Sequence, residues 1–187
     1  EDNTAVIHSP SFTLIGESTY LRFYENINED IVTDGLLPRF TLFHYAGDQV
    51  PLNSDRELAF PSRDLVQKVT ELCAYSLSLG ATNKVCDIKI APDAQTILTN
   101  FEAYARALIN NRDPVTGVKR NSRANSIVTE LWNRAHIKAL RLAGLYAVGM
   151  NYHSPKVEAY QAQAACDEIF CQTRDLQLRF DNGEVGG

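Results

Sequence analysis

The sequence has 187 residues, a net charge of −5 and a pI near 5.4, a length that suits one domain or two small lobes. Its composition, 44% hydrophobic and 22% charged, is that of a globular protein and excludes fibrous and intrinsically disordered classes. The acidic balance argues against DNA binding through bulk charge. Because no apolar run approaches the roughly 20 residues that cross a bilayer and no leader pattern opens the chain, we expect a cytoplasmic protein without a membrane partner.

The first part of the chain predicts a strand, a helix and a second strand. Residues 11–16 (SFTLIG) and 40–45 (FTLFHY) are short β-rich runs. Between them, Ser18 or Thr19 caps a helix that reaches about Asn28. A polar turn over residues 30–35 and a loop over residues 47–61 complete this part.

The remainder predicts a mainly helical lobe with one short strand. Ser62 caps a helix over residues 62–80, alternation over residues 84–90 predicts a half-buried strand, and Pro92 begins another helix. After a turn-rich segment over residues 110–125, a long helix reaches Val148. Beyond Ala139 this helix is apolar nearly all round, which predicts a central buried position.

A last helix follows Pro155 and reaches about Phe180. The residues predicted to face inward on the four helices are Leu65, Val66, Val69, Leu72, Cys73 and Ser76; Ile97, Leu98, Phe101, Tyr104, Ala105, Leu108 and Ile109; Val128, Leu131, Trp132, Ala135, Ala139, Leu142, Ala143 and Tyr146; and Ala162, Ala165, Cys166, Ile169, Phe170 and Thr173.

Four cysteines, at positions 73, 86, 166 and 171, form no CxxC pair, and the histidines stand at no ligand-like spacing from them. We expect reduced, structural thiols, with a disulfide or a metal role as the alternative.

The chain lacks the motifs that build a nucleotide site. No lysine follows a glycine, so there is no Gly-Lys-Ser or Gly-Lys-Thr phosphate loop. No apolar strand ends in paired acids that hold magnesium, and the Gly-x-Ser-x-Gly and His-Glu-x-x-His motifs are absent too. By itself, therefore, the chain should bind neither ATP nor Mg²⁺ and should not be catalytic.

Two arginines stand out by their surroundings. Arg39 lies between Pro38, which stiffens its approach, and a predicted strand, which fixes its exit. Arg134 shares one edge of an apolar helix with Lys138 and Arg141, at i, i+4 and i+7. The alternatives are a surface arginine at a strand start and a basic helix edge in water.

The order of these segments resembles the late part of the ATPase core in AAA+ proteins and related helicases. Residues 16–19 (GEST) follow the first predicted strand, residues 35–40 (GLLPRF) lead into the second, and residues 131–134 (LWNR) lie near the start of a long helix. The minichromosome maintenance helicases carry a similar Leu-Leu-Ser-Arg-Phe segment. Together with residues 151–155 (NYHSP), the set is similar to a phage and prophage family of helicase-like or primase-helicase proteins, over about residues 11–183.

The resemblance implies that residues 1–60 end a P-loop-type ATPase core and that residues 61–187 form a lid-like helical lobe. It implies that Arg39 is an arginine finger acting in trans, and that Arg134 and Lys138 face the nucleotide from the lid. Residues Glu17, Ser18 and Thr19 stand where the family's strand often ends in a γ-phosphate-sensing asparagine.

The implied parent is a homo-oligomeric, ATP-dependent DNA helicase of phage replication, whose missing N-terminal portion binds ATP and Mg²⁺. Two alternatives remain open at this stage. One is a non-catalytic module that docks a protein partner through its acidic surface, and the other is a structural relative without ATPase activity.

The turn-rich segment carries a local positive charge. Arg112, Lys119, Arg120 and Arg123 stand there against one acid, Asp113, and such a loop contacts nucleic-acid phosphates in many proteins. It lacks aromatic residues for base stacking, so a solvated loop is the alternative interpretation.

Overall fold

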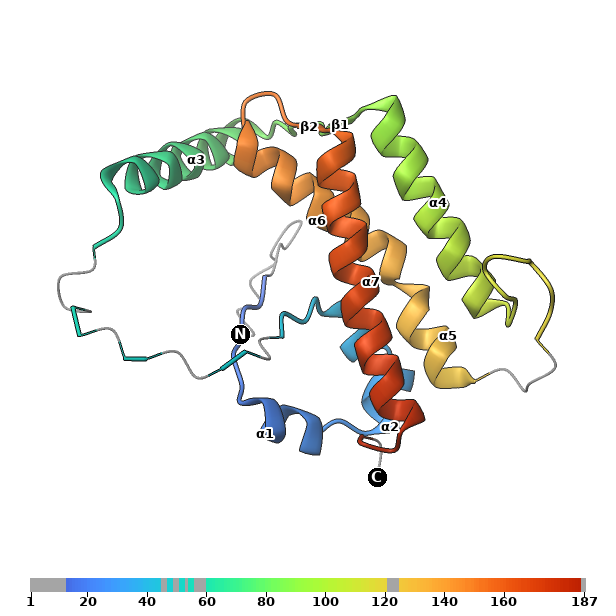
Figure 1. The fold of residues 1–187 in the computed structure, drawn as a ribbon. Coiled ribbons are helices and arrows are strands. Elements are labelled where there is room, and N and C mark those ends of the chain that lie inside the picture. Colours follow the sequence, from blue (N-terminus) through green and yellow to red (C-terminus); the bar gives the residue numbers. More distant parts are fainter. Residues whose placement is uncertain are drawn as a thin grey trace, which may run out of the picture.

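The structure, a computed structural model, describes residues 13–44, 47–48, 51–52, 54–55, 60–120 and 125–185. Over these ranges the chain is mostly helical (Figure 1). The elements in chain order are α1 (Tyr20–Glu25), α2 (Glu29–Thr33), the 3₁₀ helix η1 (Leu37–Arg39), α3 (Arg63–Thr82), β1 (Lys89–Ile90), α4 (Pro92–Ile109), α5 (Ser126–Asn133), α6 (Ala135–Met150), β2 (Lys156–Val157) and α7 (Ala159–Asp181).

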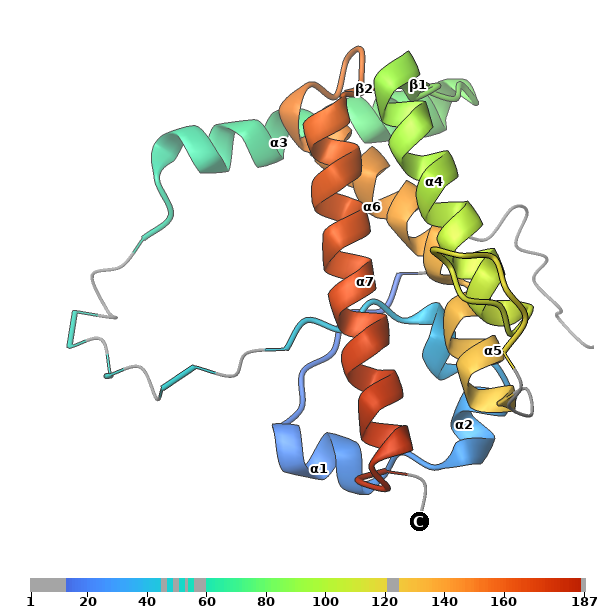
Figure 2. The same ribbon diagram turned by 45° about the vertical axis from the view of Figure 1, so that its right-hand side comes forward.

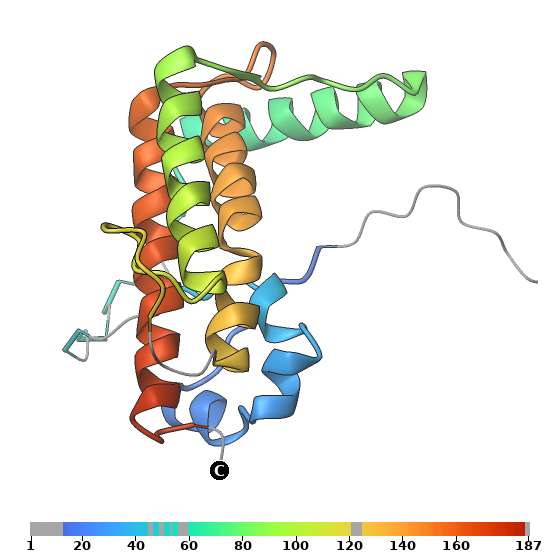
Figure 3. The same ribbon diagram turned by 90° about the vertical axis from the view of Figure 1, so that its right-hand side faces the viewer.

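Helices α4 to α7 form the body of the molecule, in which α7 packs against both α4 and α6 (Figure 2). At one end, β1 and β2 form a two-stranded parallel sheet in which Lys89 is paired with Lys156 and Ile90 with Val157. At the other end, α2 and η1 pack against α5 (Figure 3). The helical lobe expected from the sequence is therefore present.

Aromatic side chains fill the centre of this bundle. Trp132 on α5 is 1% exposed, and its ring centroid lies 5.6 Å from that of Tyr104 on α4 and 5.9 Å from that of Phe170 on α7. These edge and tilted contacts are favourable arrangements for aromatic rings. The indole Nε1 donates a hydrogen bond to Gln177 Oε1 at 2.8 Å, which satisfies the buried polar end of the tryptophan.

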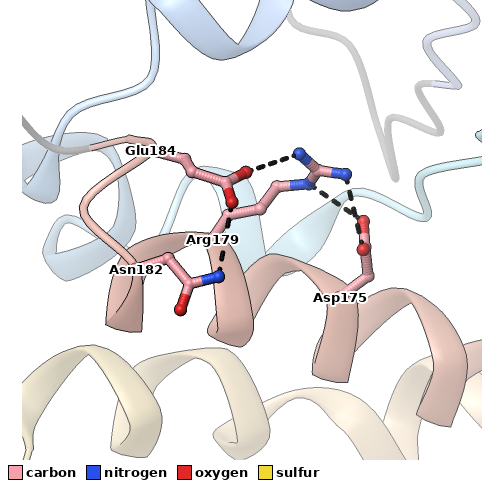
Figure 4. A network of polar contacts seen from close by, with 4 residues as sticks. All are labelled: Asp175, Arg179, Asn182 and Glu184. Carbon is pink, nitrogen blue, oxygen red and sulfur yellow. Dashed lines mark hydrogen bonds and ion pairs between the residues drawn. The ribbon is translucent and has the colours of Figure 1, made fainter.

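A polar network holds the last turn of α7 (Figure 4). Arg179 Nε donates to Asp175 Oδ2 at 3.1 Å, and Arg179 Nη1 donates to Glu184 Oε2 at 3.0 Å. Asn182 Nδ2 reaches the other oxygen of Glu184 at 3.3 Å. The guanidinium also lies 4.5 Å from the ring centroid of Tyr24, so the same arginine joins α7 to α1 through a cation–π contact.

The two strands expected near the N-terminus are wrong over the residues that the structure describes. Residues 13–16 and 40–44 are irregular, while residues 11, 12 and 45 lie outside the described ranges. A strand forms only where another strand accepts and donates its backbone hydrogen bonds, and among the described residues neither segment is paired with a strand. Ile15 is accordingly 92% exposed and Phe43 70% exposed.

Three further expectations need correction. The helix expected up to Asn28 ends at Glu25, and most of the expected polar turn is α2, which starts where the Asn28 side chain accepts from Ile31 N. The strand expected over residues 84–90 is regular only at β1. The sequence pattern also missed β2, because a two-residue strand has no period to detect.

The expected long helix is broken at Arg134, which ends α5 and precedes α6 with φ −103° and ψ −4°. Its second half was expected to be buried all round, but only one face of α6 is covered. Leu145 and Met150 are 67% and 72% exposed. Apolar residues on every side of a helix therefore do not show that other parts of the protein cover every side.

Helix α3 begins as expected, with the Ser62 hydroxyl accepting from Leu65 N at 3.2 Å. It ends at Thr82 rather than at Gly80, and the capping residue Asn83 adopts the left-handed conformation with φ 54°. None of its residues is buried, so the inward face expected for this helix, Cys73 included, is wrong for the described chain. Among the described residues, no helix combines the length and apolar character needed to cross a membrane.

Truncating the core should be costly. Ile169 on α7 is 0% exposed, so Ile169→Ala should lower the free energy of unfolding by about 2–5 kcal/mol through lost burial and a residual cavity. Urea denaturation followed by the fluorescence of Trp132, the single tryptophan, measures this loss. The control is Leu145→Ala, which should cost less than about 0.5 kcal/mol. Equal losses for the two variants would contradict this arrangement of the core.

Candidate functional site

The segment that carries Arg39 is a tight, well-anchored turn. Gly35 N donates to Val32 O at 2.9 Å, Arg39 N donates to Leu36 O at 3.1 Å, and Phe40 N donates to Leu37 O at 3.0 Å. Leu37 and Pro38 are buried against the bundle. Since proline fixes its own φ and two apolar side chains anchor the turn, the backbone of Arg39 has a defined position.

Arg39 folds back onto the start of this turn. Its Nη1 donates to the carbonyl of Gly35, while the residue as a whole stays exposed. Gly35 has φ +74°, a conformation that glycine adopts without strain, and a Cβ added there would lie 2.8 Å from Arg39 Nη1. The absence of a side chain at Gly35 therefore permits the positive φ of the backbone and leaves room for the Arg39 guanidinium. Several of the five N–H donors of the guanidinium remain available to an anion.

Two side chains from the helical lobe hold the chain immediately after Arg39. Lys138 Nζ on α6 donates to the carbonyl of Phe40 at 3.0 Å. Gln172 Oε1 on α7 accepts from Leu42 N at 3.0 Å, and Gln172 Nε2 donates to Glu168 Oε1 at 2.7 Å. We call Lys138 and Gln172 the latch, because together they bind the residues after η1 to two different helices.

The latch lysine lies in a largely apolar cavity. The cavity has a volume of about 10 Å³ and is lined by Leu37, Pro38, Phe40, Leu42, Leu131, Lys138, Gln172, Thr173 and Leu176. Burial lowers the pKa of Lys138 from 10.5 to about 8. Thr173 is 3% exposed, and its hydroxyl has no hydrogen-bond partner among the described residues. A space of this size is near the minimum that a single water molecule needs, and therefore far too small for a nucleotide.

The structure thus places Lys138 differently from its expected partner Arg134. Arg134 is exposed at the junction of α5 and α6, one turn before Lys138, whose backbone N donates to Arg134 O at 3.0 Å. Arg141 is exposed as well. Because η1 packs against α5 and Phe40 binds Lys138, the segment of Arg39 lies beside the helix junction that carries Arg134. The nucleotide-facing role of either residue stays a prediction.

Residues Glu17, Ser18 and Thr19 lie apart from this arrangement. All three are exposed, and Thr19 precedes α1 without a side-chain capping bond. Ser18 Oγ donates to the carbonyl of Thr19 at 3.3 Å. No hydrogen bond or ion pair among the described residues connects the three to Arg39 or Arg134, so their sensing role gains no geometric support.

The basic loop between α4 and α5 has a defined shape over its described part. Arg112 and Lys119 form an antiparallel bridge, and Arg112 Nη1 donates to Gly117 O at 3.0 Å. Asp113 Oδ1 accepts from the backbone N of Thr116 at 2.7 Å, which is the main reason why the pKa of Asp113 is lowered. The one acid in the loop is therefore used to close the turn.

Three predicted nucleic-acid contacts, Arg112, Lys119 and Arg120, are exposed on this loop. Arg123 lies outside the described residues. Exposed cations on a loop of defined shape suit contacts with phosphates. A loop that is only solvated would have the same exposure, so this observation fits both interpretations.

Sequence reasoning missed Gln172, Gly35 and Thr173 as parts of this site. Gly35 had a detectable signal, because a glycine before a proline-containing turn often marks positive φ. Gln172 had none, since its hydrogen bond with Leu42 spans 130 positions of sequence, and Thr173 was expected on the inward face of the last helix but not at this site.

No protein-family model matches this chain, and neither a curated protein nor a solved structure matches it. The described residues contain no group of three or more His, Cys, Asp or Glu side chains that could hold a metal ion. The resemblance to phage helicase-like proteins therefore rests on the sequence motifs.

The Gly35–Arg39 contact can be tested by a double-mutant cycle. Gly35→Ala should lower the free energy of unfolding by about 1–3 kcal/mol, because it adds strain at positive φ and a clash with the guanidinium. In an Arg39→Ala background the same change should cost less, since only the backbone strain remains. Urea denaturation measures the four variants, and identical costs in both backgrounds would show that the arginine does not lie over Gly35.

The lowered pKa of Lys138 predicts the direction in which the stability of the fold changes with pH. Between pH 8 and pH 10.5 the unfolded chain binds more protons at this lysine than the folded chain does, so stability should rise with pH. The gain is at most about 3 kcal/mol across this window. Subtracting the profile of Lys138→Met from that of the wild type isolates it from the tyrosines that titrate nearby. A flat difference profile would contradict the buried position.

Proposed function

We propose that this chain is the C-terminal part of a phage-type, ATP-dependent DNA helicase that acts in replication. The observation that carries the proposal is Arg39, an exposed guanidinium on a turn whose entry is fixed by Gly35 and Pro38 and whose exit is latched to two helices. A rigidly held, exposed arginine suits the stabilisation of negative charge on a neighbouring subunit. The order of motifs around it supports the assignment to the helicase-like family.

In this proposal Arg39 acts in trans, so the parent is a homo-oligomer. Arg134, exposed at the α5–α6 junction, faces the nucleotide of its own subunit. Both guanidinium groups are planar forks of donors, which match phosphate oxygens. The N-terminal portion of the parent supplies the phosphate loop and binds ATP and Mg²⁺. Lys138 does not suit a direct phosphate contact, because its amine is committed to the Phe40 carbonyl, and we assign it a positioning role instead.

DNA would contact the loop between α4 and α5. Arg112, Lys119 and Arg120 are exposed there, and each phosphate that such a cation neutralises adds to a salt-dependent, sequence-independent affinity.

A second candidate is a non-catalytic interaction module. The exposed apolar face of α3 favours it, because Leu77 is 74% exposed and Leu65 is 54% exposed on a helix without any buried residue. Contiguous exposed apolar surface commonly marks a protein interface. This candidate requires no nucleotide site in the parent.

The finger role can be tested in the full-length parent. Arg39→Ala should lower kcat for ATP hydrolysis by about 1,000-fold while the dissociation constant for ATP changes little, because the arginine acts on the transition state of the neighbour. Arg22→Ala is the matched control, since Arg22 on α1 is 80% exposed and pairs only loosely with Glu25 at 3.9 Å. Normal turnover in Arg39→Ala would reject the assignment.

A mixing experiment separates a trans role from a role in the arginine's own subunit. Subunits with Arg39→Ala are mixed with subunits whose phosphate-loop lysine is replaced, each inactive alone. If Arg39 acts in trans, mixed oligomers contain interfaces with one intact phosphate loop and one intact arginine, and part of the turnover returns. No recovery in proven mixed oligomers would contradict a trans-acting finger.

A further inference from the structure

The cavity beside the latch contains a buried hydroxyl group that lacks a partner. Thr173 on α7 lines this cavity and is 3% exposed, and its Oγ1 forms no hydrogen bond among the described residues. A hydroxyl group can donate one hydrogen bond and accept two. Because a buried polar atom that makes none is destabilising, native proteins satisfy most such atoms with a protein group or an ordered water molecule.

The amine of Lys138 lines the same cavity and has donors to spare. It carries three N–H groups, of which one binds the carbonyl of Phe40 at 3.0 Å. Within the described ranges it forms no hydrogen bond with Thr173. The lowered pKa of Lys138 reflects the unfavourable burial of its charge. A small molecule between the two side chains would therefore satisfy the hydroxyl and solvate the ammonium group.

Two other residues of the cavity wall, Phe40 and Gln172, can supply acceptors. The carbonyl of Phe40 accepts from Lys138, and Gln172 Oε1 accepts from Leu42 N at 3.0 Å. An amide oxygen has two lone pairs, so each of these oxygens can accept one more hydrogen bond. The wall of the cavity thus combines donors with acceptors.

The size and the mixed polarity of the cavity select one kind of ligand. A volume of about 10 Å³ is enough for a single water molecule and for nothing much larger. An anion would lie against the amide oxygens and a cation against the ammonium group, so like charges would oppose either ion. We propose that the cavity binds one structural water molecule, which accepts a hydrogen bond from Lys138 Nζ and donates one to Thr173 Oγ1.

The bound water has a third partner within the same wall. Its second O–H group donates to the amide oxygen of Gln172 or to the carbonyl of Phe40, which gives it the roughly three hydrogen bonds that are usual for a buried water. A bridging water of this kind is nearly as favourable as a direct hydrogen bond. The water therefore joins α6 to α7 and is a third part of the latch.

This inference assigns Thr173 a positioning role. Through the water, the hydroxyl holds the Lys138 amine beside the carbonyl of Phe40, and with it the residues that follow Arg39. The inference does not rest on the proposed helicase function, because it concerns how one segment is attached to the helical lobe. It can therefore be tested on the 187-residue chain.

A crystal structure of this chain, at a resolution that shows ordered waters, tests the site directly. We expect electron density within about 3.2 Å of both Lys138 Nζ and Thr173 Oγ1. This density should disappear in Thr173→Val, which keeps nearly the same shape without the hydroxyl. A wild-type cavity without density, or density that persists in the variant, would overturn the proposal. An anomalous signal in the cavity after a bromide soak would overturn it as well, because the ligand would then be an anion.

The titration of the Lys138 amine gives a second measurement, in solution. Lysine side chains labelled with carbon-13 are followed by NMR across the pH range, and the signal that is lost in Lys138→Met identifies the residue. In Thr173→Val the ammonium group loses its water ligand, so we expect the pKa of Lys138 to fall below its value in the wild type. Thr173→Ser retains the hydroxyl and should titrate like the wild type.

Thr96→Val is the matched control for the loss of a helix hydroxyl. Thr96 Oγ1 on α4 donates to the carbonyl of Pro92 in its own helix at 3.0 Å, and the residue does not line the cavity. The pKa of Lys138 should not change in this variant. Circular dichroism confirms that each variant is folded. Equal pKa values in the wild type and in Thr173→Val, or an equal fall in Thr173→Ser, would contradict a water held by the hydroxyl.

Discussion

The hydrogen bond from Lys138 to the carbonyl of Phe40 determines how the N-terminal segment lies on the helical lobe. A backbone carbonyl that turns away from water needs a donor, because an unsatisfied one costs about 1–3 kcal/mol. Here the donor is an amine whose own burial is unfavourable and lowers its pKa to about 8. The bond thus satisfies two groups that would each be destabilising alone. Gln172 Oε1 accepts a second hydrogen bond from Leu42 N. Together the two bonds fix the exit of the turn and therefore the direction in which Arg39 points.

The described chain separates a well-packed region from less covered ones. Around Trp132, ring contacts from α4, α5 and α7 and a satisfied indole leave little freedom for rearrangement. The α3 helix, the irregular residues 13–16 and the loop with Arg112 lie outside this core. All the residues for which we propose contacts with nucleotide or DNA are at its surface, and the core serves to hold their backbones in place, as in many proteins where function lies on loops over a rigid scaffold.

Helices with local signals were predictable, and features that depend on distant partners were not. Pro92 marked the start of α4 and Ser62 that of α3, and the inward stripe of α7 was correct at Ala162, Ala165 and Ile169. The strands failed because strand pairing is decided elsewhere in the chain, as the exposure of Ile15 shows. Lys138 was expected to face a nucleotide because it lies four residues after Arg134, on the same edge of the helix. The helical period does not reveal that the Lys138 amine instead binds the carbonyl of Phe40, 98 positions away in the sequence. The break at Arg134 interrupts no apolar period and left no sequence signal.

The length of α7 gives the molecule a mechanical property. Its 23 residues make a rod about 35 Å long, joined to β1 through β2 at one end and to α1 through Arg179 at the other. Gln172 is about 20 Å along this rod from its first residue. A tilt of about 5° at the sheet would move Gln172 by nearly 2 Å, more than a hydrogen bond tolerates. Because α4, α5 and α6 all pack against α7, such a tilt is opposed, and this support keeps Gln172 within hydrogen-bond reach of Leu42 N.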